Sequence, residues 1–109
     1  MVTKTNLQEL LNFEGQSPVL SVYLNTNPAE GTIENYKLRL RSMLKDIDLP
    51  EDVEKVKGYF DHNHDWGQGR SVAVFSSGGG EFFESFPMAV NISPHAHVSR
   101  YPYIYPLAA

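Results

Sequence analysis

The fold is decided by the stretch Pro18-Val19-Leu20-Ser21-Val22-Tyr23-Leu24-Asn25-Thr26. Leu20, Val22 and Leu24 alternate with a second set of side chains, which is the period of a strand with two faces. The following residues, 27–31, are rich in turn formers. We therefore predict a strand over residues 18–26, and the rest of the chain is interpreted around it.

Helical patterns are predicted on both sides of this strand. Thr5 and Gln8 have the spacing of a capping box, which predicts a short helix over about residues 6–13 that Gly15 ends. After the strand, Thr32 is expected to cap a helix of about fifteen residues. Its inward stripe is predicted to consist of Ile33, Tyr36, Leu40, Met43, Leu44 and Ile47.

The second half of the chain predicts one more helix and three more strands. Pro50 breaks the preceding pattern and begins a helix whose inward residues are Val53, Val56, Tyr59 and Phe60. A second strand is predicted over 71–76, a hairpin loop over 77–80, a third strand over 81–86, and a fourth within 90–100. The order α-β-α-α-β-β-β indicates an α+β two-layer sandwich, with about four mostly antiparallel strands and helices packed on the sheet.

Length and composition restrict the function classes. The 109 residues are enough for a single domain, 1–109, and the absence of cysteine excludes disulfides, thiol nucleophiles and Cys-ligated metals. The sequence contains neither a membrane-spanning run nor a signal-peptide pattern, so a cytoplasmic location with no membrane partner is expected. We expect no cofactor.

The net charge of −4 conceals a basic segment. Residues 37–45 carry +4 and no acid, whereas residues 46–65 carry −5. Helical spacing places Lys37, Arg41 and Lys45 along one flank of the apolar stripe and Arg39 on the other. These four residues, called the basic ridge below, are candidates for contact with RNA phosphates, although such a ridge is more often a solvated face.

Two His-x-His pairs suggest a different chemistry. His62 and His64 form one pair, His95 and His97 the other, and Asp65 could add an oxygen ligand. Brought together, the four imidazoles could bind zinc, nickel or copper. The alternative is that both pairs are solvated residues in loops or at strand ends.

The end of the chain is rich in tyrosine. Tyr101, Tyr103 and Tyr105 alternate, so that in an extended conformation their rings project the same way. They are candidates for stacking on bases or for packing against a neighbouring domain. Since the chain ends in apolar residues, packing against further polypeptide is the favoured interpretation.

No catalytic motif is found. Ser76 and Ser77 lack the Gly-x-Ser-x-Gly elbow of serine hydrolases. The glycines at 78–80 neither form Gly-x-Gly-x-x-Gly nor precede a helix, so they predict a hairpin turn and not a phosphate cradle. We therefore expect a domain that is not an enzyme.

Four stretches, taken in order, resemble a known family. They are residues 19–28 (Val-Leu-Ser-Val-Tyr-Leu-Asn-Thr-Asn-Pro), 36–44 (Tyr-Lys-Leu-Arg-Leu-Arg-Ser-Met-Leu), 69–77 (Gly-Arg-Ser-Val-Ala-Val-Phe-Ser-Ser) and 101–107 (Tyr-Pro-Tyr-Ile-Tyr-Pro-Leu). Together they resemble the N-terminal domain of the bacterial relatives of archaeo-eukaryotic class 1 peptide chain release factors and Pelota. The resemblance covers nearly the whole chain and lies in the order of the motifs more than in any one of them.

The resemblance implies a ribosome-associated role in termination, rescue or hibernation, with ribosomal RNA as partner. It also implies downstream domains of the same polypeptide, one of them bearing a Gly-Gly-Gln tripeptide; Gly79-Gly80 is followed by Glu81 and is not that motif. Eukaryotic members read stop codons with an Asn-Ile-Lys-Ser loop and a Tyr-x-Cys-x-x-x-Phe strand. The corresponding loop here, 46–52, is acidic, and the chain has no cysteine, so stop-codon reading is not expected.

Three hypotheses follow. The leading one is a non-catalytic, ribosome-binding N-terminal domain of a release-factor-like protein. The second is a small metal- or ligand-binding enzyme domain that uses the His-x-His pairs. The third is a structural domain that docks onto other domains or self-associates through its tyrosine-rich end.

Overall fold

The chain forms a four-stranded antiparallel sheet with helices packed on it. The structure, a computed structural model, describes residues 4–11, 17–66, 69–104 and 106. Its helices are α1 (Lys4–Leu11), α2 (Ile33–Leu44) and α3 (Pro50–His62). The strands are β1 (Val19–Asn25), β2 (Ser71–Ser77), β3 (Phe82–Met88) and β4 (His95–Ser99), with a short 3-10 turn, η1 (Gly78–Gly80), between β2 and β3. The α+β class and the predicted order of elements are confirmed.

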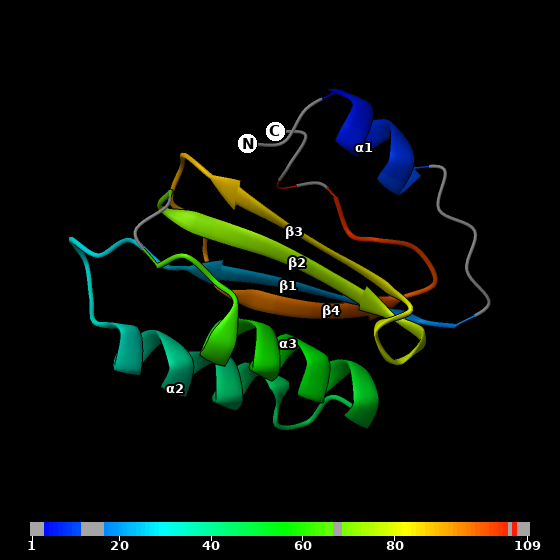
Figure 1. The fold of residues 1–109 in the computed structure, drawn as a ribbon, viewed down its shortest axis with the longest axis horizontal. Helices are drawn as coiled ribbons and strands as arrows, with labels where there is room; N and C mark the ends of the chain where they lie inside the picture. Colours follow the sequence, from blue (N-terminus) through cyan, green and yellow to red (C-terminus); the bar gives the residue numbers. More distant parts are fainter. Residues whose placement is uncertain (1–3, 12–16, 67–68, 105, 107–109) are drawn as a thin grey trace.

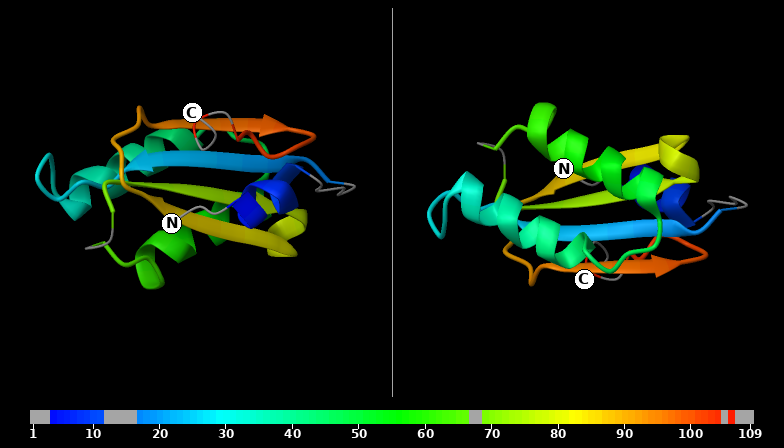
Figure 2. Two further views of the ribbon diagram at one scale, coloured as in Figure 1. Left: turned by 90° about the horizontal axis from the view of Figure 1, so that it is seen from above. Right: turned by 90° about the horizontal axis from the view of Figure 1, so that it is seen from below.

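The strand order is β3-β2-β1-β4, and every pairing is antiparallel. The helical pair α2 and α3 returns the chain to the end of β1 where β2 must start, so β1 and β2 pair antiparallel, and they are the two central strands. Figure 1 shows α2 and α3 below the sheet and α1 above it. Figure 2 adds that α2 runs beneath β1 and β4, whereas α3 runs beneath β2 and β3.

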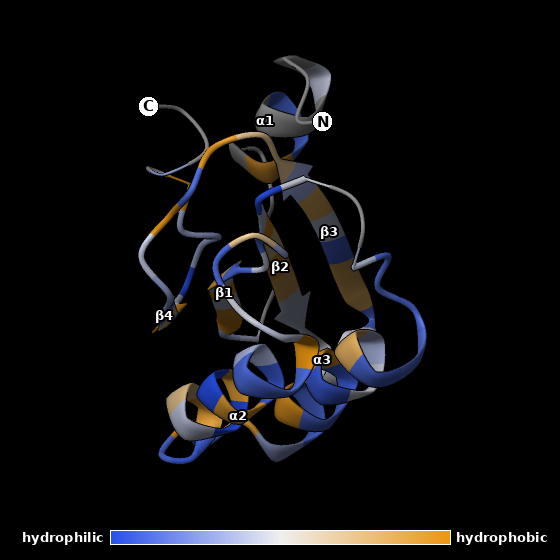
Figure 3. Cartoon of the chain, turned by 90° about the vertical axis from the view of Figure 1, so that its left-hand side faces the viewer, coloured by the Kyte–Doolittle hydropathy of each residue, from blue (hydrophilic) through white to orange (hydrophobic). Residues whose placement is uncertain are grey.

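The main core lies between the sheet and the two long helices. Leu20, Val22 and Leu24 of β1 pack there with Val72 and Val74 of β2. The helices contribute Tyr36, Leu40, Leu44, Val53, Val56 and Phe60. Figure 3 shows the resulting pattern, in which α2 and α3 carry both hydrophilic and hydrophobic patches.

The opposite face of the central strands is buried as well. Val19 and Tyr23 of β1 pack there with Ala73 and Phe75 of β2, below Leu10 of α1. Phe86 and Met88 of β3 join them, and Tyr103 and Ile104 of the C-terminal segment add further cover. Val19 and Tyr23, which alternate with Leu20, Val22 and Leu24 along β1, therefore face a second apolar cluster.

Several predicted boundaries shift. Thr5 lies inside α1 and does not cap it, while Gly15 lies outside the described residues. Thr32 caps α2 as predicted, its Oγ1 accepting the N–H of Asn35 at 3.1 Å, but the helix has twelve residues. Ile33, in its first turn, is 47% exposed and does not join the inward stripe.

The third strand is longer than predicted, since β3 continues through Pro87 to Met88. Proline has no backbone N–H, so in a central strand it leaves a neighbouring strand without a hydrogen-bond donor. In an edge strand its nitrogen can face away from the sheet, where no donor is needed. The edge position of β3, which only the sheet order reveals, thus explains why Pro87 does not end the strand.

Candidate functional site

The basic ridge is positioned by the buried side of α2. Tyr36, Leu40 and Leu44 anchor the helix on the sheet, and the Tyr36 hydroxyl donates to the carbonyl of Asn27 at 2.6 Å. Because these residues occupy one side of the helix, the remaining positions face outward. Leu38, which lies within the basic segment, is 59% exposed.

One member of the ridge is paired. The ammonium of Lys37 lies 3.2 Å from a carboxylate oxygen of Asp61 on α3, and both side chains are partly exposed. An exposed pair of this kind contributes about 0–1 kcal/mol of stability. Asp61 partly neutralises Lys37, which is therefore less available to phosphate than the other three members.

The other three members are exposed. Arg39 and Arg41 lie on α2, and Lys45 follows its last residue. None of the three forms an ion pair with another described residue. Three cations on about two helical turns can therefore meet phosphate groups without first breaking an internal ion pair.

The acidic loop between α2 and α3 lies directly after the ridge. Asp46 and Asp48 are exposed, as is Glu51 in the first turn of α3. Like charge repels phosphate, so the end of the molecule formed by this loop is unfavourable for RNA contact. Lys45 lies next to this loop, whereas Arg39 and Arg41 lie farther back along α2.

Beside this loop, Asp52 holds the β2–β3 hairpin against α3. Its Oδ1 accepts the hydroxyl of Ser76 at 2.6 Å and the N–H of Gly79 at 3.1 Å, and the side chain is 5% exposed. This connection is not predicted from the sequence. The available signal was an acid two residues after Pro50, but an acid in the first turn of a helix is common for its effect on the helix dipole alone.

The two histidine pairs lie in different layers. His64 follows α3 and contacts Phe60 and Trp66, which belong to the cluster between sheet and helices. His95 stacks on Tyr23 at a ring separation of 4.8 Å, on the opposite face of the sheet. The structure does not bring the two pairs into one four-histidine site.

His64 is held by its neighbours on α3. Its Nδ1 lies 3.0 Å from the hydroxyl of Tyr59, whereas its buried Nε2 has no hydrogen-bond partner. Burial lowers the pKa of His64, and nearby Asp65 opposes that change only in part. His62 is exposed at the end of α3. Within the described parts of the chain, no three His, Asp or Glu side chains are grouped as metal ligands.

The tyrosines of the C-terminal segment have different environments. Tyr103 is half-buried, contacting the rings of Tyr23, His95 and His97, while Tyr101 is 57% exposed. Tyr105 lies outside the described residues. Tyr103 is thus used within the domain, and Tyr101 is the described ring of this group that remains accessible.

The exposed cations of the basic ridge thus lie on α2 and directly after it. The chain matches no protein-family model, and no curated protein matches it. Among the described helices, none has the length and apolar character to cross a membrane.

Proposed function

We propose that the chain is the non-catalytic N-terminal domain of a bacterial release-factor-like protein, and that it binds ribosomal RNA through α2. The proposal includes a cytoplasmic location and a role in termination, rescue or hibernation, without stop-codon reading. The observation that carries the RNA contact is the exposure of Arg39 and Arg41 on α2 and of Lys45 directly after it, without ion-pair partners among the described residues.

The fold is compatible with the family resemblance. The order α-β-α-α-β-β-β is the one that the resemblance implies, and the stretch 36–44 of the resemblance lies within α2. Electrostatic contacts with phosphates supply affinity without sequence specificity, which suits a domain that docks on a structured RNA surface.

The proposal is tested by cosedimentation of the protein with ribosomes over a series of salt concentrations. We expect binding at low salt that weakens as salt rises, because phosphate contacts release counterions. The double variant Arg39→Glu with Arg41→Glu should bind at least about tenfold more weakly and with a shallower salt dependence.

The matched control reverses two cations on α3. Lys55→Glu with Lys57→Glu changes the net charge by the same amount but leaves α2 intact. If the control loses as much binding as the α2 variant, bulk charge and not the ridge determines association. Absence of the wild-type protein from every ribosomal fraction at low salt would refute the proposed function.

A further inference from the structure

The outer edge of β3 offers backbone groups for pairing. The sheet order places β3 at an edge, and the carbonyl of Met88 accepts the N–H of Arg70 on the β2 side at 2.8 Å. Backbone groups of successive strand residues point alternately to the two sides, so those of Phe83 and Ser85 point away from the sheet. Pro87, on the same alternation, has no N–H to offer there. Pairing is therefore favoured at residues 83–85.

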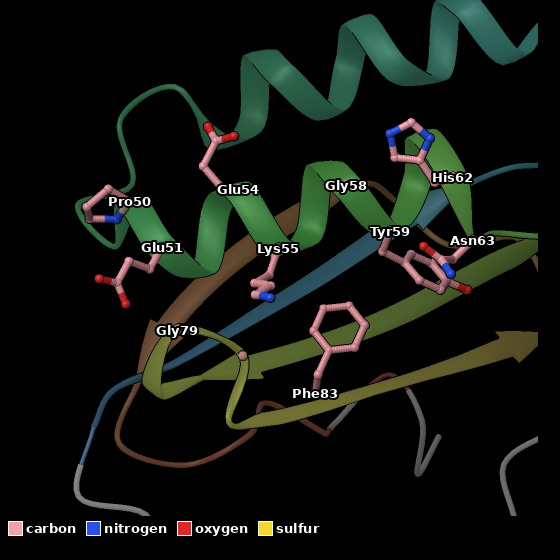
Figure 4. A pocket seen from close by; sticks show the side chains of 11 residues that line it. Pro50, Glu51, Glu54, Lys55, Gly58, Tyr59, His62, Asn63, Gly79 and Phe83 are labelled. Atoms are coloured by element: carbon pink, nitrogen blue, oxygen red, sulfur yellow. The ribbon is translucent and has the colours of Figure 1, made fainter.

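A groove of about 900 Å³ runs beside this part of β3, between α3 and the hairpin (Figure 4). The rings of Tyr59 and Phe83, with centroids 5.7 Å apart, form an apolar surface within it. Gly58 leaves the α3 side open, since a Cβ atom at that position would meet nothing within 4 Å. The groove thus has room for large side chains of a bound segment.

Edge and groove fit one kind of occupant. Phe83 faces the helical layer, because it packs against the cluster there and because it is registered with Ser76 of β2. A strand added to β3 would turn every second side chain to that same side. Those side chains would enter the groove, while the backbone pairs with Phe83 and Ser85.

The charge around the groove determines the chemistry of that occupant. Glu51, Glu54 and Lys55 are among the residues that line the groove, and Glu81 lies beside it on the hairpin, so the acids there outnumber the one lysine. Glu51 lies against Gly79 and Glu81 against Gly78, both are exposed, and neither forms an ion pair with another described residue. We propose that the β3 edge binds an extended, basic segment of another protein, which adds a strand to the sheet and inserts apolar side chains into the groove.

This interface is independent of the proposed RNA contact, which uses α2. It is tested on the wild-type protein with a seven-residue peptide in which lysine and leucine alternate, and with the same peptide carrying glutamate in place of lysine. We expect the basic peptide to bind at least about tenfold more tightly, because the potentials are complementary. In NMR spectra, the amide shifts of residues 82–86 and of α3 should change.

One change in the peptide and one in the protein test the strand pairing and the use of the groove. N-methylation of the backbone along one edge of the basic peptide should abolish binding, since the methyl groups prevent strand pairing. Gly58→Leu should weaken binding at least about tenfold by filling the groove, and it removes a residue that is unfavourable within a helix. The matched control, Ser42→Leu, places the same side chain on the exposed side of α2 and should leave binding unchanged.

A charge variant at exposed positions supplies a test that does not depend on how Gly58→Leu affects folding. Glu51→Lys with Glu81→Lys, at exposed positions, should lower the affinity for the basic peptide and raise it for the acidic one. Equal binding of both peptides, shifts confined to α2 or β4, or full affinity in Gly58→Leu would each overturn the proposal.

Discussion

At the scale of single residues, His64 shows how local packing sets a proton equilibrium. Its ring lies beside Phe60 and Trp66, and a hydrogen bond joins its Nδ1 to the Tyr59 hydroxyl. With Nε2 buried and unpartnered, a proton there would carry charge into an apolar environment. The folded chain therefore favours the neutral imidazole.

This environment predicts a pH dependence of stability. The pKa of His64 is lower in the folded chain than in the unfolded chain, where it is about 6.5. The unfolded state thus binds more protons as the pH falls through that value, and the free energy of unfolding decreases until the folded pKa is passed. Urea unfolding at pH 8 and at pH 5.5 should show the decrease.

The control for this prediction is His64→Gln, which removes the titrating group. We expect a smaller difference in unfolding free energy between the two pH values in this variant than in the wild type. An equal difference would mean that groups other than His64 account for the pH dependence.

At the scale of elements, the structure links parts of the chain that are distant in sequence. Asp52 joins the start of α3 to the hairpin between β2 and β3 by accepting from Ser76 and Gly79. The hairpin itself requires glycine, since Gly78, Gly79 and Gly80 all have positive φ. The link fixes one end of the groove beside β3.

Removal of this link should destabilise the fold. Asp52→Ala leaves the Ser76 hydroxyl and the Gly79 N–H without their acceptor, at a cost of about 1–3 kcal/mol in the free energy of unfolding. Urea denaturation measures this cost. The control Glu51→Ala removes an exposed neighbouring carboxylate and should change stability by no more than about 0.5 kcal/mol. Equal effects in both variants would contradict a specific role for Asp52.

At the scale of the whole molecule, the C-terminal segment covers the sheet face opposite α2 and α3. The N–H of Tyr103 donates to Ser21 Oγ at 3.0 Å, and the Tyr23 hydroxyl donates to the carbonyl of Tyr103. The two contacts fix the segment on β1 across about eighty residues of sequence. Burial raises the pKa of Tyr23, and Tyr103 raises it further.

The variant Tyr23→Phe tests this contact. Loss of the hydrogen bond should lower the free energy of unfolding by about 0.5–1.5 kcal/mol at pH 7. Because the folded pKa is raised, the contribution of Tyr23 is complete below the unfolded value of about 10 and declines as the pH rises above it. Unfolding measured at pH 7 and pH 11 should therefore show a steeper loss in the wild type than in the variant.

The exposed Tyr101 supplies the matched control. Tyr101→Phe removes a hydroxyl from a residue that is 57% exposed and should change stability by no more than about 0.5 kcal/mol at pH 7. A steep loss at high pH that persists in Tyr23→Phe would mean that Tyr23 is not its cause.

The elements of this fold follow largely from local patterns. The alternation of residues 18–26, the Thr32 cap and Pro50 at the start of α3 each act within a few residues, so the sequence alone predicts them. The exposure of Arg39, Arg41 and Lys45 also follows, since a helix with one apolar stripe leaves its other side in water.

Only the tertiary structure decides what lies beside what. The sequence determined an α+β chain with a basic helix, but strand order placed β3 at an edge and put the two histidine pairs in different layers. The packing of the helices also pairs Lys37 with Asp61 and brings Asp52 to the hairpin. The physical reason is that helix and strand periodicity is set by neighbouring residues, whereas these contacts depend on how the elements exclude water together.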